Sequence, residues 1–327
     1  MKYFIGIDLG GTNIKVGLVD EQGVVIASSS TRTPRDSDPD RIITRMTEAA
    51  GSVARSGGMQ LTDISGIGIG SPGPIDLEHG VVIGMPNLNG WDCIPLCQRI
   101  EEATGVPTTL ENDANAAAFG EFWTGAGRDP NIRDMVMVTL GTGIGTGLII
   151  AGKIVHGARG VAGEGGHMIV QPDGRQCGCG QRGCLEAYAS AANTARRAEE
   201  SLAREPRSVL HEVRKANNGT LTSKHVFDAA NAADPVALAV VRETARYLAV
   251  GCVSFCRILD PSMIVFAGGM ILAGDLLFEM VREAFADNSW NVMSDHVRIV
   301  PAELGNEAGF IGAAAIACDA GRTEAER

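Results

Sequence analysis

Three cysteines and one histidine form the most specific local pattern in the chain. Cys177, Cys179 and Cys184 lie in a short glycine-rich stretch, CGCGQRGC, and His167 lies shortly before it. Three thiolates and one imidazole make a complete four-coordinate ligand set for structural zinc. A disulfide between Cys177 and Cys179 would be strained by its short loop, and ordinary buried cysteine does not suit so polar a segment. The spacing therefore predicts a zinc knuckle.

Asn112 and Asp113 lie between a predicted strand and a predicted helix. In the stretch LENDANAAAFGE, the strand ends at Glu111 and the helix begins near Asp113 or Ala114. Ligand sites of α/β proteins gather at such strand ends. A hydroxyl group that attacks a phosphate needs a base for its proton, and a carboxylate fixed at a helix start can act as that base. The alternative is that Asp113 only caps the helix, which aspartate does well.

Two glycine-rich turns could bind phosphate. The stretch DLGGTN begins at Asp8 and has Lys15 close by, and the stretch LGTGIGTG covers residues 140–147. Phosphate oxygens are bound by converging N–H and O–H donors, and Asp8 could hold Mg²⁺ directly or through water. Neither turn fits the GxxxxGK[ST] loop, and neither opens a helix as a dinucleotide fingerprint must. Glycine-rich hairpins are common, but these two occupy equivalent places in a repeat.

That repeat organises the chain. Residues 3–29 and 135–156 each read as strand, glycine turn, strand, second turn and strand, and such duplication is the first thing to look for in a fold. The further elements predicted are helices over residues 40–56 and 307–319, helical segments within 187–258, and strands over 64–69, up to 111 and over 263–266. This alternation predicts an α/β protein with two similar domains around a cleft. We expect the domains at 1–118 and 119–304, with a C-terminal helix at about 305–320 packing back on the first.

Length and charge narrow the classes of function. A chain of 327 residues suits two domains, since single cores stop growing at about 250–300 residues. The net charge of −11 disfavours nucleic-acid and anionic-membrane partners, although backbone N–H groups and cations can still bind a nucleotide. The N-terminal strand is interrupted too early by Asp8 for a secretory signal, and the apolar stretch 263–281 is broken by Gly268-Gly269 and Asp275. We therefore expect a cytoplasmic protein.

The paired turns make the chain resemble the sugar kinase–actin–heat-shock ATPase superfamily. The resemblance implies the actin-like (ribonuclease H-like) fold, with turns from both domains clamping a nucleotide and residues 267–269 beside its adenosine. The knuckle sharpens the resemblance to the bacterial ROK family (repressors, open reading frames, kinases), and to its glucokinases, over essentially the whole chain. The matching segments are residues 8–15, 70–74, 86–87, 111–121, 140–147, 164–167, 177–186 and 267–269.

The family resemblance implies a function and a set of site residues. It implies ATP- and Mg²⁺-dependent phosphorylation of glucose at its 6-hydroxyl, a step of glycolysis, with Asp113 as general base. The implied sugar contacts are Gly73, Asn87, Asn112, Asp113, Glu164, His167 and Glu186. The implied nucleotide contacts are Asp8, Gly10, Gly11, Thr12, Asn13, Lys15, Gly141, Thr142, Gly143, Gly268 and Gly269, with Asp8 also the magnesium ligand. Relatives of this kind are usually dimers or tetramers, which implies a homo-oligomer.

The residues themselves agree with this map. A sugar needs several polar partners, which two carboxylates and two amides provide. Glu164 and Glu186 flank the zinc ligands, so a rigid knuckle would fix both relative to His167. If one nitrogen of His167 binds zinc, the other can donate to a sugar hydroxyl. One departure is Thr146, where many relatives carry glycine in the second phosphate turn, and it leaves the detailed geometry of that turn open.

Three alternatives to glucose kinase remain. The family includes DNA-binding repressors, which carry an added N-terminal helix-turn-helix, whereas this acidic chain begins at the first strand of the kinase domain. An actin-like ATPase without a sugar would explain the turns but not Asn112, Asp113, Glu164 or the knuckle. A kinase for another sugar, such as N-acylmannosamine, N-acetylglucosamine, fructose or allose, shares most ligands and stays open. Polyphosphate as the phosphoryl donor also stays open.

Overall fold

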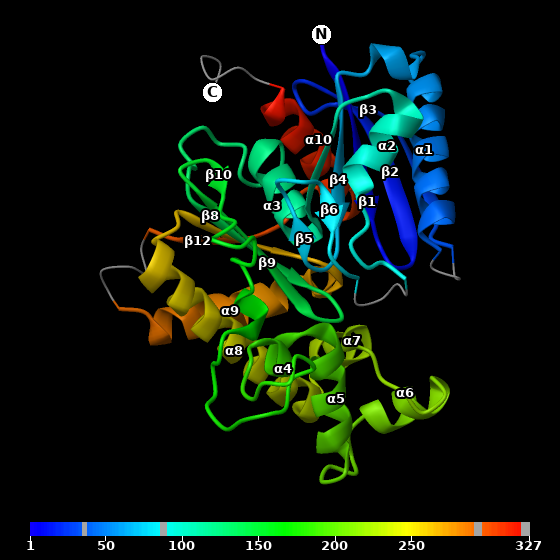
Figure 1. Cartoon of the computed structure of the whole chain (residues 1–327). Coiled ribbons are helices and arrows are strands. Elements are labelled where there is room, and N and C mark those ends of the chain that lie inside the picture. The colour runs from blue at the N-terminus through cyan, green and yellow to red at the C-terminus, as the bar shows by residue number, and fades with distance from the viewer. Residues whose placement is uncertain (35–37, 86–89, 291–295, 322–327) are drawn as a thin grey trace.

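Two five-stranded sheets with the same topology form the framework of the protein (Figure 1). The computed structural model describes residues 1–34, 38–85, 90–290 and 296–321. The N-terminal sheet contains β1 (Tyr3–Leu9), β2 (Asn13–Asp20), β3 (Val25–Arg32), β4 (Gly66–Ser71) and β7 (Thr108–Asn112), in the order β3-β2-β1-β4-β7. The C-terminal sheet contains β8 (Met135–Leu140), β9 (Ile144–Ile150), β10 (Lys153–Ile154), β11 (Met263–Ala267) and β12 (Arg298–Pro301), in the order β10-β9-β8-β11-β12.

The pairing pattern confirms the predicted repeat. In each sheet, the first three strands along the chain form an antiparallel meander. The two later strands then add in parallel to the free edge of the first. The α/β class and the duplicated plan were therefore predictable, because glycine turns and apolar runs recur in the same order in both halves.

Helices cover both sheets. Around the N-terminal sheet lie α1 (Pro39–Ser56), α2 (Leu96–Thr104), α3 (Asp113–Trp123) and α10 (Ala308–Ala320). The C-terminal half contains α4 (Glu186–Ala189), α5 (Ala191–Leu202), α6 (Leu210–Ala216), α7 (Ser223–Asn231), α8 (Pro235–Leu259) and α9 (Asp275–Asn288). Short elements complete the list: hairpin β5 (Ile75–Asp76) and β6 (Val81–Val82), and 3₁₀ turns η1 (Leu61–Asp63), η2 (Gly165–His167), η3 (Gly269–Ala273) and η4 (Gly305–Glu307). Among the described residues, no helix is both long and apolar enough to cross a bilayer.

The alternation of β1 explains how the two faces of the N-terminal sheet are covered. Ile5 and Ile7 point to one face, where they share a core with Ile42 and Met46 of α1. Phe4 belongs to the opposite face, in a cluster built largely from α10. Figure 1 shows α10, in red, against the blue N-terminal strands, although more than two hundred residues separate them in sequence. Burial of both faces accounts for the continuous apolar character of these central strands.

Two glycines set how closely α10 approaches the sheet. Gly6 on β1 lies opposite Gly68 on β4 in the parallel register. A Cβ atom at Gly6 would fall 1.7 Å from the carbonyl oxygen of Phe310, and one at Gly68 would fall 1.8 Å from that of Ala313. Both distances are far inside van der Waals contact with backbone atoms, so α10 can occupy this position only over glycine.

Helix α3 bridges the two halves of the molecule. It follows β7 of the N-terminal sheet directly, while its Ala118 packs with Met135 and Met137 of β8. The domain division predicted at residues 118 and 119 falls inside this helix, and we retain it as a proposal. The consequence for the site is that one rigid element carries residues from the strand end of the first sheet to the surface of the second.

The glycine contact predicts a position-specific sensitivity to added methyl groups. Gly68→Ala should lower the free energy of unfolding by roughly 1–3 kcal/mol or more, because the new Cβ overlaps the backbone of α10. Gly66→Ala, two residues earlier on the same strand, is the matched control, because its nearest foreign atom would lie 3.5 Å away, an ordinary contact. Chemical denaturation measures both. Equal stability of the two variants would contradict the packing described here.

Candidate active site

The two glycine turns close in similar ways. In the first, the Gly10 N–H donates to the carbonyl of Asn13 at 3.0 Å, and Thr33 Oγ1 donates to the Gly10 carbonyl at 2.6 Å. In the second, the Gly141 N–H donates to the carbonyl of Gly143 at 3.0 Å. The second turn is one residue shorter, since Leu9 pairs with Ile14 whereas Leu140 pairs with Ile144.

A cavity of 580 Å³ lies between the two sheets and the start of α10. The predicted nucleotide residues that line it are Asp8, Lys15, Gly141, Gly143 and Gly268. The other predicted nucleotide residues, which belong to the same turns, fall outside its lining: Gly10, Gly11, Thr12, Asn13, Thr142 and Gly269. The structure thus brings at least one residue of each predicted nucleotide turn to a single cavity.

Asp8 and Lys15 form an ion pair in this cavity. Lys15 Nζ lies 3.5 Å from Asp8 Oδ2 and donates to the carbonyl of Asn306 at 3.2 Å. Burial raises the pKa of Asp8, and the neighbouring lysine charge opposes that rise. The carboxylate is therefore held where its charge is only partly compensated, which suits a ligand for a divalent cation.

A second, smaller cavity of 260 Å³ adjoins the first. Four of the predicted sugar contacts line it: Gly73, Asn112, Asp113 and Glu164. Of the remaining predicted contacts, Asn87 lies outside the described residues, and His167 and Glu186 do not contribute to this lining. Asp113 lines both cavities, together with Ala114 and Gly145. This aspartate is the one acidic side chain that the two described cavities share.

The start of α3 fixes Asp113 at that junction. Asn112 is the cap residue, because its Oδ1 accepts from the N–H groups of Ala114 and Asn115 at 3.0 and 3.2 Å. The alternative that Asp113 is the cap is therefore wrong, although its Oδ1 also accepts from Ala114 at 2.8 Å. Burial raises the pKa of Asp113, and the negative charges of Asp8 and Glu164 add to the rise.

Glu186 begins α4 and supports the second turn. Its Oε2 accepts from the Ile144 N–H at 2.8 Å, and it lines the larger cavity. A Cβ atom at Gly143 would lie 2.4 Å from the same oxygen, so a side chain there would displace this carboxylate. In this conformation, Glu186 contacts the second glycine turn, not the smaller cavity.

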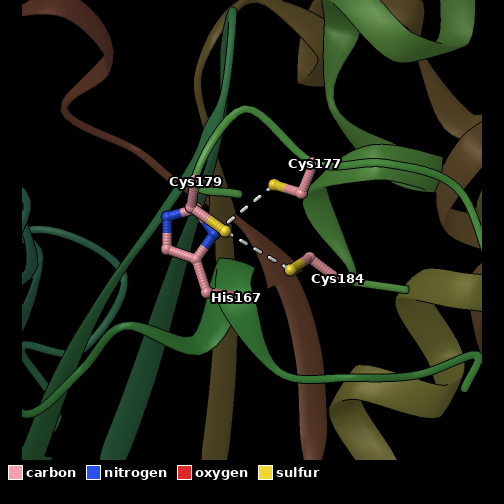
Figure 2. Close-up of side chains that lie close together, drawn as sticks. All are labelled: His167, Cys177, Cys179 and Cys184. Atoms are coloured by element: carbon pink, nitrogen blue, oxygen red, sulfur yellow. Dashed lines mark hydrogen bonds between the residues drawn. The ribbon is translucent and has the colours of Figure 1, made fainter. Parts of the chain in front are cut away.

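All four predicted metal ligands come together (Figure 2). One ligand atom from each of His167, Cys177, Cys179 and Cys184 lies within 4.8 Å of every other. His167 Nδ1 is 3.7 Å from Cys177 Sγ, and the sulfur atoms of Cys179 and Cys184 are also 3.7 Å apart. Tetrahedral Zn–S bonds of about 2.3 Å put two sulfur atoms about 3.8 Å apart, so this donor set fits zinc.

The imidazole of His167 lies between the three cysteines and Glu164. Its Nδ1 faces the cysteines, while its Nε2 lies 4.0 Å from Glu164 Oε2. A metal bound at Nδ1 would thus leave Nε2 directed toward a carboxylate that lines the smaller cavity. Donation from Nε2 to a sugar hydroxyl stays a prediction.

Thr146 has a different place from the one predicted. It lies in β9, after the shortened turn, so it does not alter the geometry of the phosphate turn. Its buried hydroxyl donates to the Gly163 carbonyl and accepts from the Gly165 N–H at 2.8 Å. These bonds flank Glu164 on both sides. No motif signals this role, because it depends on how the segment before η2 folds against β9.

Residues at the start of α10 also belong to the site and were not predicted. Asn306, Ala308 and Gly309 line the larger cavity. A Cβ atom at Gly309 would lie 2.8 Å from the carboxyl carbon of Asp8, so this glycine allows the helix to meet the carboxylate. The sequence gives no local sign of this contact, because it joins opposite ends of the chain.

Comparison with known proteins places these features in a family. Residues 4–320 match the model of the ROK family. The chain is 37% identical to a glucokinase of Halalkalibacterium halodurans, over 95% of this chain and 93% of that protein. It superimposes on the crystal structure of a ROK family glucokinase from Streptomyces griseus, in complex with glucose and AMPPNP, with a TM-score of 0.79, 35% identity and coverage of 97% and 99%. It is 29% identical to the xylose repressor of Bacillus subtilis, over 97% of this chain and 77% of that protein.

The raised pKa of Asp113 predicts a stability effect. Because the folded-state pKa lies above the unfolded value, keeping the carboxylate charged destabilises the folded protein at neutral pH. Asp113→Asn should therefore raise the melting temperature at pH 7 in the absence of nucleotide and metal. The gain should shrink as pH falls through the raised pKa and vanish below about 3.9, the ordinary aspartate value.

Thermal unfolding as a function of pH checks this, with the exposed Asp287→Asn on α9 as the control for removing one negative charge. If Asp113→Asn destabilises the protein at pH 7, or if both variants behave alike, the burial argument for Asp113 is wrong.

Proposed function

The chain belongs to the ROK family, and on that premise we propose that it is an ATP- and Mg²⁺-dependent kinase that phosphorylates glucose at its 6-hydroxyl. The observation that carries the proposal is the position of Asp113 in both cavities. Phosphoryl transfer needs a donor and an acceptor that meet in line at one point. A nucleotide in the larger cavity and a sugar in the smaller one would meet beside this aspartate.

We assign Asp113 as the general base. It would accept the proton of the 6-hydroxyl as that oxygen attacks the γ-phosphate, and ADP would leave on the opposite side. A pKa raised by burial supports this role, because it makes the carboxylate a stronger base. The cap formed by Asn112 fixes the backbone at the start of α3, from which the side chain of Asp113 projects.

The nucleotide would lie along the larger cavity. Asp8 would hold Mg²⁺ directly or through water, and that cation would neutralise phosphate charge near two carboxylates whose pKa values are both raised by burial. Lys15 would add a further positive charge toward the phosphates. The glycine turns, including Thr12, Asn13 and Thr142, would supply N–H and O–H donors as the cavity narrows around the nucleotide.

The sugar would be held from both halves of the molecule. Asn112 and Glu164 line the smaller cavity. Outside its lining, His167 contacts Glu164, and Glu186 contacts the second glycine turn. Closure of the two halves on the sugar would bring all four to its hydroxyl groups and exclude water from the γ-phosphate.

Zinc would have a structural role. His167 and the three cysteines would fill all four positions of a tetrahedral ion, which leaves none open for the substrate. The metal would hold His167, Glu164 and Glu186 relative to one another, because Cys177 Sγ also lies 3.5 Å from Glu186 Oε1. It would thus act on sugar affinity and not on phosphoryl chemistry.

Glucose is preferred to the other sugars because the similar proteins named above include two glucokinases. Kinases for N-acylmannosamine, N-acetylglucosamine, fructose or allose remain the alternative within the same mechanism. A repressor role is disfavoured by the net charge of −11, since DNA binding requires basic surface.

The test of the proposal is a coupled assay over these sugars with ATP and Mg²⁺. Glucose should give the highest kcat/KM. Asp113→Asn should lower kcat by roughly 10²–10⁴ with glucose binding much less affected, because the variant loses only the proton acceptor. Wild-type kcat in this variant would exclude Asp113 as base, and a faster reaction with another sugar would reassign the substrate.

Removal of a zinc ligand should affect glucose binding and ATP binding differently. Cys179→Ser should lose the metal, raise the KM for glucose and lower the melting temperature, because the exposed end of the knuckle is released. ATP binding should be nearly intact, since the glycine turns belong to other segments. Metal analysis and calorimetric titration of both ligands are the measurements, with Cys93→Ser, at an exposed cysteine outside the cluster, as the control. Normal glucose binding in a zinc-free protein would refute the coupling.

A further inference from the structure

Glu111 is a buried carboxylate next to the site that the proposed function does not use. It is the penultimate residue of β7 and is 3% exposed. Its Oε1 accepts from the Asn112 N–H at 2.9 Å and from Asn115 Nδ2 at 3.0 Å. Glu111 therefore holds the residues on both sides of Asp113, one through the backbone and one through a side chain.

The partner of the second carboxylate oxygen comes from the other sheet. His156 Nε2 lies 2.7 Å from Glu111 Oε2, and His156 follows β10 of the C-terminal sheet. The hydrogen bond with Glu111 raises the pKa of His156, and burial opposes that rise. A buried carboxylate without such a partner would be strongly unfavourable.

His156 also begins the segment that carries Glu164. Its carbonyl accepts from the Ala162 N–H at 3.0 Å, which closes the loop over residues 156–162. Gly160, Val161 and Ala162 of this loop line the smaller cavity. The far end is held by Thr146, whose hydroxyl bonds flank Glu164. The loop is thus fixed at its start to the N-terminal sheet and at its end to β9.

We propose that Glu111 and His156 are a positioning pair. They link the loop over residues 156–162, which follows the C-terminal sheet, to the start of α3, which follows the N-terminal sheet. The inference rests on the proposed function for its kinetic meaning. Through Asn112 and Asn115, the pair sets the backbone of Asp113, and through the loop at residues 156–162 it sets the approach to Glu164. Neither residue touches the reacting atoms.

The pair of Glu111 and His156 also lines a cavity outside the proposed active site. Glu111 and His156 line a third cavity, of 680 Å³, between α3, α10 and the turn before β10. Figure 1 shows β10 beside α3 at this place. Lys153 lines the same cavity from β10 and is exposed. Its replacement changes the charge of the cavity without changing the pair, so it provides a matched control.

The test combines kinetics with hydrogen–deuterium exchange on the full chain. His156→Gln should lower kcat/KM for glucose by about 10- to 100-fold, the usual effect of a small misplacement of catalytic groups. Both kcat and the KM for glucose should change, while the KM for ATP should not. Deuterium uptake should rise together in residues 111–116 and 155–165, because the pair holds both segments.

Three further variants isolate the pair. Thr146→Val should raise uptake in residues 155–165 and the KM for glucose while leaving residues 111–116 and kcat close to wild type. Glu111→Gln/His156→Gln should recover part of the loss seen in His156→Gln, because no unpaired buried charge remains. Lys153→Gln should match wild type throughout.

The outcomes distinguish this inference from the proposed function. An unchanged kcat/KM and unchanged uptake in folded His156→Gln would overturn the positioning role even if the wild type phosphorylates glucose. A lower melting temperature alone, with normal kinetics, would reduce the pair to a structural contact and would also overturn it. Coupled uptake of the two segments in a wild type that phosphorylates no sugar would retain the link and reject the proposed function.

Discussion

One constraint shapes this site: the carboxyl group of Asp113 is held where burial disfavours its charge. Burial raises the pKa of Asp113, and the nearby charges of Asp8 and Glu164 raise it further. Water around Asp113 would lower the cost of its charge, but water there would also compete with a substrate hydroxyl for the phosphate. The surrounding structure instead fixes the carboxylate by geometry, through the Asn112 cap and the two bonds that Glu111 accepts from Asn112 and Asn115. In the proposed reaction, the same burial that destabilises the charge of Asp113 would make it a stronger base.

The duplicated fold supplies the two sides of this site. The first hairpin of each sheet turns at glycines, and Asp8 and Lys15 beside the first turn line one cavity with Gly141 and Gly143 of the second. Helix α3 follows the N-terminal sheet and packs against the C-terminal one. The close approach of α10 depends on Gly6 and Gly68, and the same helix brings Gly309 against Asp8. Packing of the C-terminal helix is therefore part of building the site. The cluster of His167 and three cysteines contacts the site residues through His167 and Glu164 and through Cys177 and Glu186.

The sequence predicts those features that depend on residues close together in the chain. The repeat, the glycine turns and the Cys₃His set each depend on such residues, and the structure has them as predicted. The strand predicted to end at Glu111 ends one residue later, at Asn112. Features made by distant segments were missed. The pair of Glu111 and His156 joins residues 45 positions apart, and α10 meets Asp8 from the far end of the chain. The role of Thr146, which lies in β9, was missed because its hydroxyl bonds with Gly163 and Gly165, which follow much later in the chain.

The pH dependence of kcat in the wild-type protein tests the central claim most directly. If a buried Asp113 is the base, kcat at saturating glucose and Mg-ATP should fall with decreasing pH, with an apparent pKa above about 3.9, the ordinary aspartate value. Intrinsic fluorescence recorded alongside would separate this fall from acid unfolding. A kcat that stays constant down to the pH at which the protein unfolds would contradict the account.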